Sequence, residues 1–141
     1  MIELHTLRQT VAAAITAAMG SAGWRESPQA PGSFGARESA QRLHQGFSVF
    51  VPSSADRGER QRTSDGALIE TRIVVSWRYQ LATGDQVASF DTALEAEADL
   101  RKVVRGIDTL QLRYAGSERS TAEGWVSGEM IWTTLHRVAL A

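Results

Sequence analysis

The stretch that decides the fold is residues 67–81, ALIETRIVVSWRYQL. Large apolar and aromatic side chains occupy every second position, as at Ile73, Val75 and Trp77, and mainly charged or polar ones lie between them. Because successive side chains of a strand point to opposite faces of its sheet, this period of two predicts one long strand with one apolar face. A strand of this kind is typical of an antiparallel sheet that is covered on one side.

A second long strand is predicted at residues 125–140. Typical strands have ~3 to 10 residues, and a strand of about fifteen residues extends ~50 Å. A globule of 141 residues has a diameter of only about 37 Å. Both strands are therefore expected either to bend at bulges, with Gly128 as a candidate position, or to project from the body as edges that need a partner.

Two segments have the period of an amphipathic helix. The first runs from residue 4 or 7 to residue 19, and its apolar stripe consists of Leu4, Leu7, Val11, Ile15 and Ala18. Its opposite face consists of small, weakly polar side chains, which suits either solvent or a second packed surface. The second helix runs from Asp91 to Arg105, with acidic residues first and basic residues last, which matches the helix dipole. Glu97 and Arg101 are expected to form an exposed pair on it, one turn apart.

The remaining segments complete the topology. Residues 47–51 alternate as in a strand that ends at Pro52, residues 110–114 form a short strand, and residues 115–123 form a polar turn region. The predicted order is therefore α-β-β-α-β-β in a single domain that spans residues 1–141. We expect an α+β fold in which a mainly antiparallel sheet of about four strands has two helices packed on one face.

Between the first two predicted strands lies a polar segment, residues 53–66, which has no large apolar side chain. Its length is near the limit for an unstructured connection in a compact domain. Its charges, which include Arg57, Arg60 and Arg62, sum to zero, which argues against an arm that binds nucleic acid. We expect a mobile loop that becomes ordered when it binds a partner.

Composition excludes several classes of site. The chain has no cysteine, so disulfides, thiol nucleophiles and cysteine-ligated metals are excluded. A net charge of -1 gives no bulk electrostatic reason to bind phosphate backbones. His5, His44 and His136 lack the spacing of a metal motif, and no phosphate-binding glycine motif is present. We predict no catalytic residue, no metal and no cofactor, and a chain that is not an enzyme.

The N-terminal region does not have the pattern of an export signal. Glu3 and His5 stand where a secretory signal carries basic residues, so we expect a protein that stays inside the cell. No segment is apolar over the roughly 20 residues that a membrane span needs, and no membrane partner is predicted.

The elements together resemble the bacteriophage tail terminator family, whose small α+β members form a ring that caps the tail tube. The helix at residues 6–19 is followed by an irregular connection and the strand Phe47-Ser48-Val49-Phe50-Val51-Pro52. The strand at residues 69–81, the helix at residues 91–105 and a final pair of strands that ends Trp132-Thr133-Thr134-Leu135-His136-Arg137-Val138 complete the layout. The resemblance covers nearly the whole chain and concerns the order, size and character of its elements.

The resemblance implies a structural virion protein that forms a ring, commonly a hexamer, caps the tail tube and stops its polymerisation. The implied partners are the tail tube protein and the head–tail connector protein, while DNA passes through the ring without being specifically bound. The implied place is the tail or neck of the virion, after assembly in the host cytoplasm. The candidate subunit or tube interface consists of five arginines: Arg57, Arg60, Arg62, Arg72 and Arg78.

Two other functions fit the same sequence. One is that of another self-assembling or adaptor α+β protein outside phage tails. The other is that of a small enzyme or ligand-binding domain whose site is assembled from scattered residues. This last alternative predicts a concave pocket in which His136 or His44 meets a carboxylate.

Overall fold

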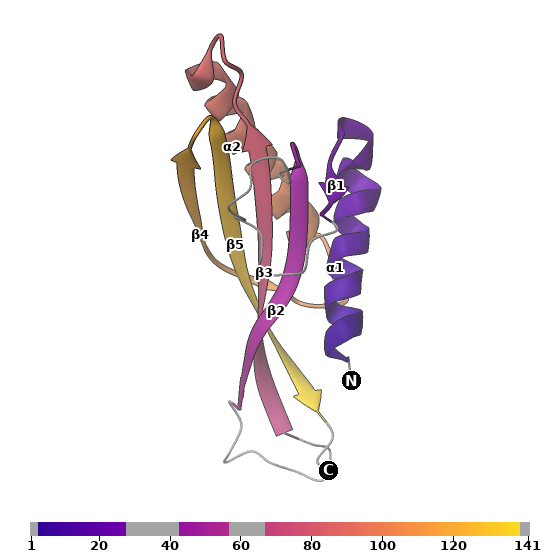
Figure 1. Ribbon diagram of the computed structural model, residues 1–141. Helices are drawn as coiled ribbons and strands as arrows, with labels where there is room; N and C mark the ends of the chain where they lie inside the picture. The colour runs from indigo at the N-terminus through magenta and orange to yellow at the C-terminus, as the bar shows by residue number, and fades with distance from the viewer. Residues whose placement is uncertain (1–2, 28–42, 57–66, 139–141) are drawn as a thin grey trace.

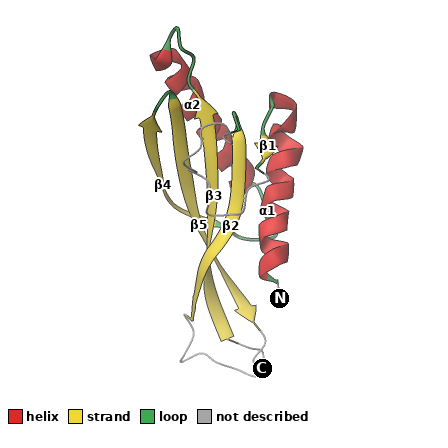
Figure 2. Ribbon diagram, in the orientation of Figure 1, coloured by secondary structure: helices red, strands yellow, loops and turns green. Residues whose placement is uncertain are grey.

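The computed structural model describes residues 3–27, 43–56 and 67–138. Its elements are α1 (Leu4–Met19), the short 3-10 helix η1 (Gly20–Ala22), β1 (Arg25–Glu26), β2 (Gly46–Asp56), β3 (Ala67–Gln80), α2 (Gln86–Arg105), β4 (Arg113–Ala122) and β5 (Trp125–Val138). The strands form one sheet in the order β1-β2-β3-β5-β4, in which only the β1–β2 pair is parallel. Both helices lie on the same side of this sheet (Figures 1 and 2).

The predicted α+β class is confirmed, with one more strand than the expected count of about four. The additional strand is β1, which pairs Arg25 with Gly46 and Glu26 with Phe47. Two residues of ladder within a glycine- and proline-rich connection leave no apolar alternation in the sequence, so pattern analysis has no signal for such a strand.

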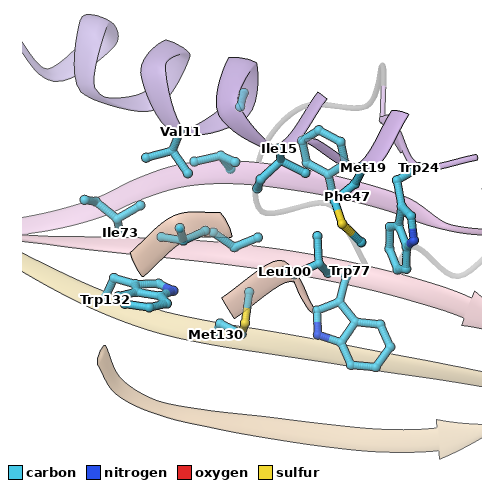
Figure 3. Packing of buried hydrophobic residues seen from close by; sticks show 14 of the residues in the cluster. Val11, Ile15, Met19, Trp24, Phe47, Ile73, Trp77, Leu100, Met130 and Trp132 are labelled. Atoms are coloured by element: carbon cyan, nitrogen blue, oxygen red, sulfur yellow. The ribbon is translucent and has the colours of Figure 1, made fainter. Parts of the chain in front are cut away.

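The core lies between the helices and the apolar face of the sheet. Figure 3 shows Ile73 and Trp77 of β3 and Trp132 of β5 on the sheet side of this layer, with Val11 and Ile15 of α1 above them. All five side chains are fully buried. Burial of a large aliphatic side chain contributes about 1.5–3 kcal/mol, so a one-residue slip of β3 is strongly disfavoured because it exposes its whole apolar set.

The second helix begins earlier than predicted. α2 starts at Gln86, and the Asp85 carboxylate caps it by accepting a hydrogen bond from the Ala88 amide at 3.0 Å. The predicted start at Asp91 was wrong because the first turn has no apolar stripe to mark it. That turn extends past the sheet (Figure 1), and Val87 within it is 75% exposed.

The second strand continues past its predicted end at Pro52. β2 extends to Asp56, with a register irregularity between Phe50 and Ser53. Proline has no N–H to donate to a ladder, and a bulge lets the strand carry it without loss of the pairing on either side. Residues 53–56 of the predicted loop are therefore strand, and residues 57–66 lie outside the described residues.

The predicted polar turn at residues 115–123 was also wrong. β4 runs from Arg113 to Ala122 at the edge of the sheet, with most of its side chains exposed. An edge strand that buries little apolar surface does not show apolar alternation, so its sequence looks like a turn. The real turn is Glu123-Gly124, whose φ values of 53° and 78° give the two left-handed positions of a tight hairpin.

The two long strands project instead of bending at a glycine. All 14 residues of β3 pair with β5 in one continuous register, so there is no bulge at the candidate position Gly128. The ends of β2, β3 and β5 instead twist around one another and extend beyond the N-terminal end of α1 (Figure 1).

Candidate assembly surfaces

The projecting ends form a terminal ribbon, which we define as residues 53–56 of β2, 67–72 of β3 and 133–138 of β5. Pairing continues through it, with Ser54 opposite Thr71 and Ile69 opposite His136. The helices do not extend over this part of the sheet (Figure 2). The ribbon therefore holds its strands together without the apolar layer that stabilises the rest of the sheet.

Hydrogen bonds between side chains connect the three strands of the ribbon. The Thr71 hydroxyl, which is fully buried, lies 2.9 Å from Ser54 Oγ and 2.6 Å from His136 Nε2. Burial lowers the pKa of His136, so the neutral imidazole is the form that this contact favours. Three polar groups, one from each strand, thus meet inside the ribbon.

The outside of the ribbon carries an exposed cation and an exposed apolar side chain, Arg72 and Leu135. Arg72 is exposed and has no hydrogen-bond or ion-pair partner among the residues that the structure describes. Leu135 is 48% exposed. Both lie on the face of the sheet that is opposite to Thr71 and His136, because they alternate with these residues along β3 and β5.

The five arginines of the predicted interface do not form one patch. Arg78 lies on the same face of β3 as Arg72, about 20 Å farther along the strand, but it is only 3% exposed. Arg57, Arg60 and Arg62 lie outside the described residues. Within the described part of the chain, Arg72 is therefore the member of the set that a partner can reach.

The second surface is the free edge of β4. This strand has ten residues and pairs on one side with β5, and no other strand among the described residues pairs with its outer side. A register irregularity between Tyr114 and Gly116 interrupts the ladder near one end, and residues 117–122 then pair regularly with β5. A regular edge of this kind presents backbone donors and acceptors to another chain.

The outer side of α1 provides a third surface. It is hollowed by a depression of about 370 Å³ lined by Arg8, Gln9, Ala12, Ala13, Thr16, Ala17 and Glu26. Arg8 Nη1 and Glu26 Oε2 form an ion pair of 3.0 Å between α1 and β1 at this depression. The small side chains of this helix face were expected to meet either solvent or another surface, and the hollow is compatible with both.

The helix–sheet interface contains an ion pair whose partner was predicted wrongly. Glu97 is only 4% exposed, and its Oε2 accepts a hydrogen bond of 2.5 Å from Arg119 Nη1 of β4, not from Arg101. The Arg101 guanidinium lies over the Tyr114 ring, 5.3 Å from its centroid. The sequence held a signal for this, since residue 97 is four residues after buried Ala93 and therefore on the same face of the helix.

The histidines of the alternative enzyme site have neutral partners. His44 Nδ1 accepts a hydrogen bond of 3.0 Å from the Gln80 amide, and its ring packs edge-on against Tyr79. Burial lowers the pKa of His44 as it does for His136, whose partner is the Thr71 hydroxyl. The pairing of His44 or His136 with a carboxylate, which the enzyme alternative predicts, is not what these contacts show.

Acidic and histidine side chains do not gather into a metal site in the described part of the chain. In residues 3–27, 43–56 and 67–138, no group of three or more His, Cys, Asp or Glu side chains is placed to hold a metal ion. Neither helix in these ranges is long and apolar enough to cross a membrane. A comparison of the sequence with known protein families and with curated proteins finds no match.

Proposed function

We propose that this chain is a structural subunit that assembles with copies of itself into a ring. Following the resemblance of its element order to tail terminators, we further propose that the ring caps the tube of a phage tail, stops its polymerisation and joins it to the head connector. The observation that carries the first part is the terminal ribbon, and the resemblance carries the second.

The ribbon supports assembly because its own contacts are few. A small set of strands needs a hydrophobic face or a helix packed on it for independent stability, and typical single strands are shorter than the 14 residues of β3 and of β5. The interior of the ribbon is polar, while Leu135 on its outside is 48% exposed. A neighbouring subunit supplies the covering surface that the helices of the same chain do not.

The free edge supports the proposed ring because it is a surface distinct from the terminal ribbon. The edge strand β4 and the terminal ribbon are different surfaces, and β2 is separated from β4 by β3 and β5. A head-to-tail contact between two different surfaces gives a closed ring when the rotation between subunits is a whole fraction of a turn. A net charge of -1 also suits a ring through which DNA passes without being held.

The first test is the mass and shape of the purified chain. Light scattering after size-exclusion chromatography is expected to give one discrete oligomer, and negative-stain images are expected to show rings with a central hole. A chain that remains a monomer at every concentration, with and without tube protein from the same genome, contradicts the proposed function.

The second test concerns the tail-capping part alone. Tube protein from the same genome is allowed to polymerise with and without the purified ring. A terminator arrests growth at substoichiometric amounts, because each ring blocks one tube end. A matched control is a variant that folds but does not form rings. Unchanged tube length in the presence of intact rings refutes the capping role and leaves self-assembly standing.

A further inference from the structure

A row of four polar residues crosses the sheet on the face opposite the helices. The pairing places Ser48 of β2 opposite Ser76 of β3, Ser76 opposite Glu129 of β5, and Glu129 opposite Glu118 of β4. Glu118 and Glu129 are thus direct cross-strand neighbours. Both are exposed. Two like charges in this position destabilise an antiparallel pair unless a cation lies between them.

The two glutamates line a pocket of about 300 Å³ together with Ser76, Arg119, Ser120, Ser127 and Gly128. Ser76 is 1% exposed, and its hydroxyl has no hydrogen-bond partner among the described residues. A buried hydroxyl without a partner is rare in folded proteins and calls for an explanation such as a bound group. The pocket, which we call the carboxylate pocket, therefore combines two negative charges with an unused buried hydroxyl.

Among the described residues, the arginines near the carboxylate pocket form no ion pair with Glu118 or Glu129. Arg119 adjoins Glu118 in sequence, but its side chain lies on the other face of the sheet and pairs with Glu97. Arg78 lies one row away, opposite Ser127. Among the described residues, neither Glu118 nor Glu129 has an ion-pair or hydrogen-bond partner.

A guanidinium group fits this set of acceptors. It is planar, carries five N–H donors and no acceptor, and binds carboxylates through paired hydrogen bonds. One such group has enough donors for both glutamates and for Ser76 Oγ, whereas a lysine ammonium has three. The pocket is about ten times larger than the ~30 Å³ that a water molecule occupies, so a whole side chain fits into it.

We propose that the carboxylate pocket of one subunit binds Arg72 of a second copy of this chain. This inference rests on the proposed self-assembly and identifies one of its contacts. Arg72 is exposed on the terminal ribbon and lacks a partner within its own subunit among the described residues. In the same subunit it lies four residues from Ser76, about 13 Å along β3. Because Arg72 and the carboxylate pocket are different patches, the same contact between successive subunits suits the head-to-tail arrangement of a ring.

Charge reversal on each side of the contact tests the proposal. Arg72→Glu places a carboxylate against the pocket, and the double variant Glu118→Arg/Glu129→Arg places cations against Arg72. Each variant alone is expected to lose the oligomer, measured as mass by light scattering, with at least a tenfold rise in the dissociation constant. Glu95→Arg, a reversal at an exposed position of α2, is the matched control and is expected to keep the wild-type mass.

Mixing the two defective variants gives the sharpest outcome. In a head-to-tail contact, the carboxylate that Arg72→Glu introduces in one variant meets the cationic pocket of the other. The native Arg72 of that second variant meets the native pocket of the first. Alternating oligomers of wild-type mass are therefore expected from the mixture, although neither variant assembles alone. Far-UV circular dichroism and thermal unfolding of each variant check that its fold is intact.

The outcomes separate this inference from the proposed function. If the single variants keep the wild-type mass, or if the mixture fails to assemble although both variants are folded, the Arg72 contact is refuted and ring formation by other contacts stands. If the unmodified chain never assembles, both the proposed function and this contact are refuted. Glu118→Gln is a further check. It removes the like-charge pair, so it is expected to leave the isolated subunit at least as stable while weakening the oligomer.

Discussion

Gly128 and Trp77 are direct partners across β5 and β3, and the indole of Trp77 occupies the space in which any other residue at position 128 holds its Cβ. Trp77 itself is fully buried and packs edge-on against Trp24, with ring centroids 6.5 Å apart. The glycine is therefore present because of a close approach and not because of an unusual backbone angle. It lets one of the three core tryptophans pack closely against the neighbouring strand.

Replacement of Gly128 by alanine is expected to destabilise the subunit by about 1–3 kcal/mol, the usual cost of an added methyl group in a filled core. Urea unfolding followed by tryptophan fluorescence measures this loss. Gly84→Ala is the control, because an added Cβ there meets no atom within 4 Å. Equal stabilities of the two variants contradict the overlap with Trp77.

The buried carboxylate of Glu97 depends on Arg119. Arg119→Ala removes the cation and leaves an acceptor that is 4% exposed without its partner, a change that typically costs about 1–3 kcal/mol. Arg113→Ala, at an exposed position on the same strand, is expected to cost less than about 0.5 kcal/mol. Chemical denaturation of the two variants is the measurement, and similar midpoints contradict the role of this pair.

Acidification is expected to weaken the fold. The pKa values of His44 and His136 lie below the ordinary 6.5 in the folded chain because burial disfavours the imidazolium. The unfolded chain therefore binds more protons below that pH. Stability is at its full value above pH 6.5 and falls as the pH drops through 6.5 toward the folded pKa values.

Thermal unfolding across this pH range in wild type and in a His44→Gln/His136→Gln variant measures the effect. The double variant is expected to show a flatter pH dependence. His5→Gln is the control, because the His5 side chain is 67% exposed. A pH profile that the double variant leaves unchanged assigns the acid sensitivity to other groups.

Leu135 is expected to contribute to assembly more than to folding. Leu135→Arg replaces an apolar side chain that is 48% exposed on the terminal ribbon, so the free energy of unfolding of the monomer changes by less than about 0.5 kcal/mol. Oligomer mass is expected to fall, because an apolar contact with the neighbour is lost. Val87→Arg, at 75% exposure on the first turn of α2, is the control. If Val87→Arg loses the oligomer and Leu135→Arg keeps it, the interface does not include Leu135.

The sequence predicts the part of the fold that buries apolar side chains. The alternation around Trp77 predicts β3, and the stripe through Val11 and Ile15 predicts α1, because burial imposes the period of each element on its sequence. β4 and the end of β2 bury little apolar surface, and residues 86–88 at the start of α2 are exposed. Their boundaries depend on a ladder or on the Asp85 cap, neither of which leaves an apolar pattern.

The candidate surfaces are less accessible to sequence analysis than the core. Ser76, Glu118 and Glu129 are adjacent only because of the register of three strands, and register between strands far apart in the chain depends on packing. Arg72 belongs to a predicted group of arginines, and only its position on the ribbon distinguishes it from buried Arg78. The length of β3 and β5, by contrast, is visible in the sequence. It predicted that these strands either bend or project, and they project.

The polar interior of the terminal ribbon has a consequence for how the subunit opens. Backbone hydrogen bonds over Ile73 and Trp77 break only with the whole core, whereas those beside Thr71 lie outside the core cluster and next to the polar contacts with Ser54 and His136. The ribbon is therefore a separate cooperative unit with a lower opening free energy than the core. In the free subunit, the ribbon amides are expected to exchange with deuterium before those of the core. They are expected to become protected when a neighbouring subunit covers them, so their exchange rates report assembly.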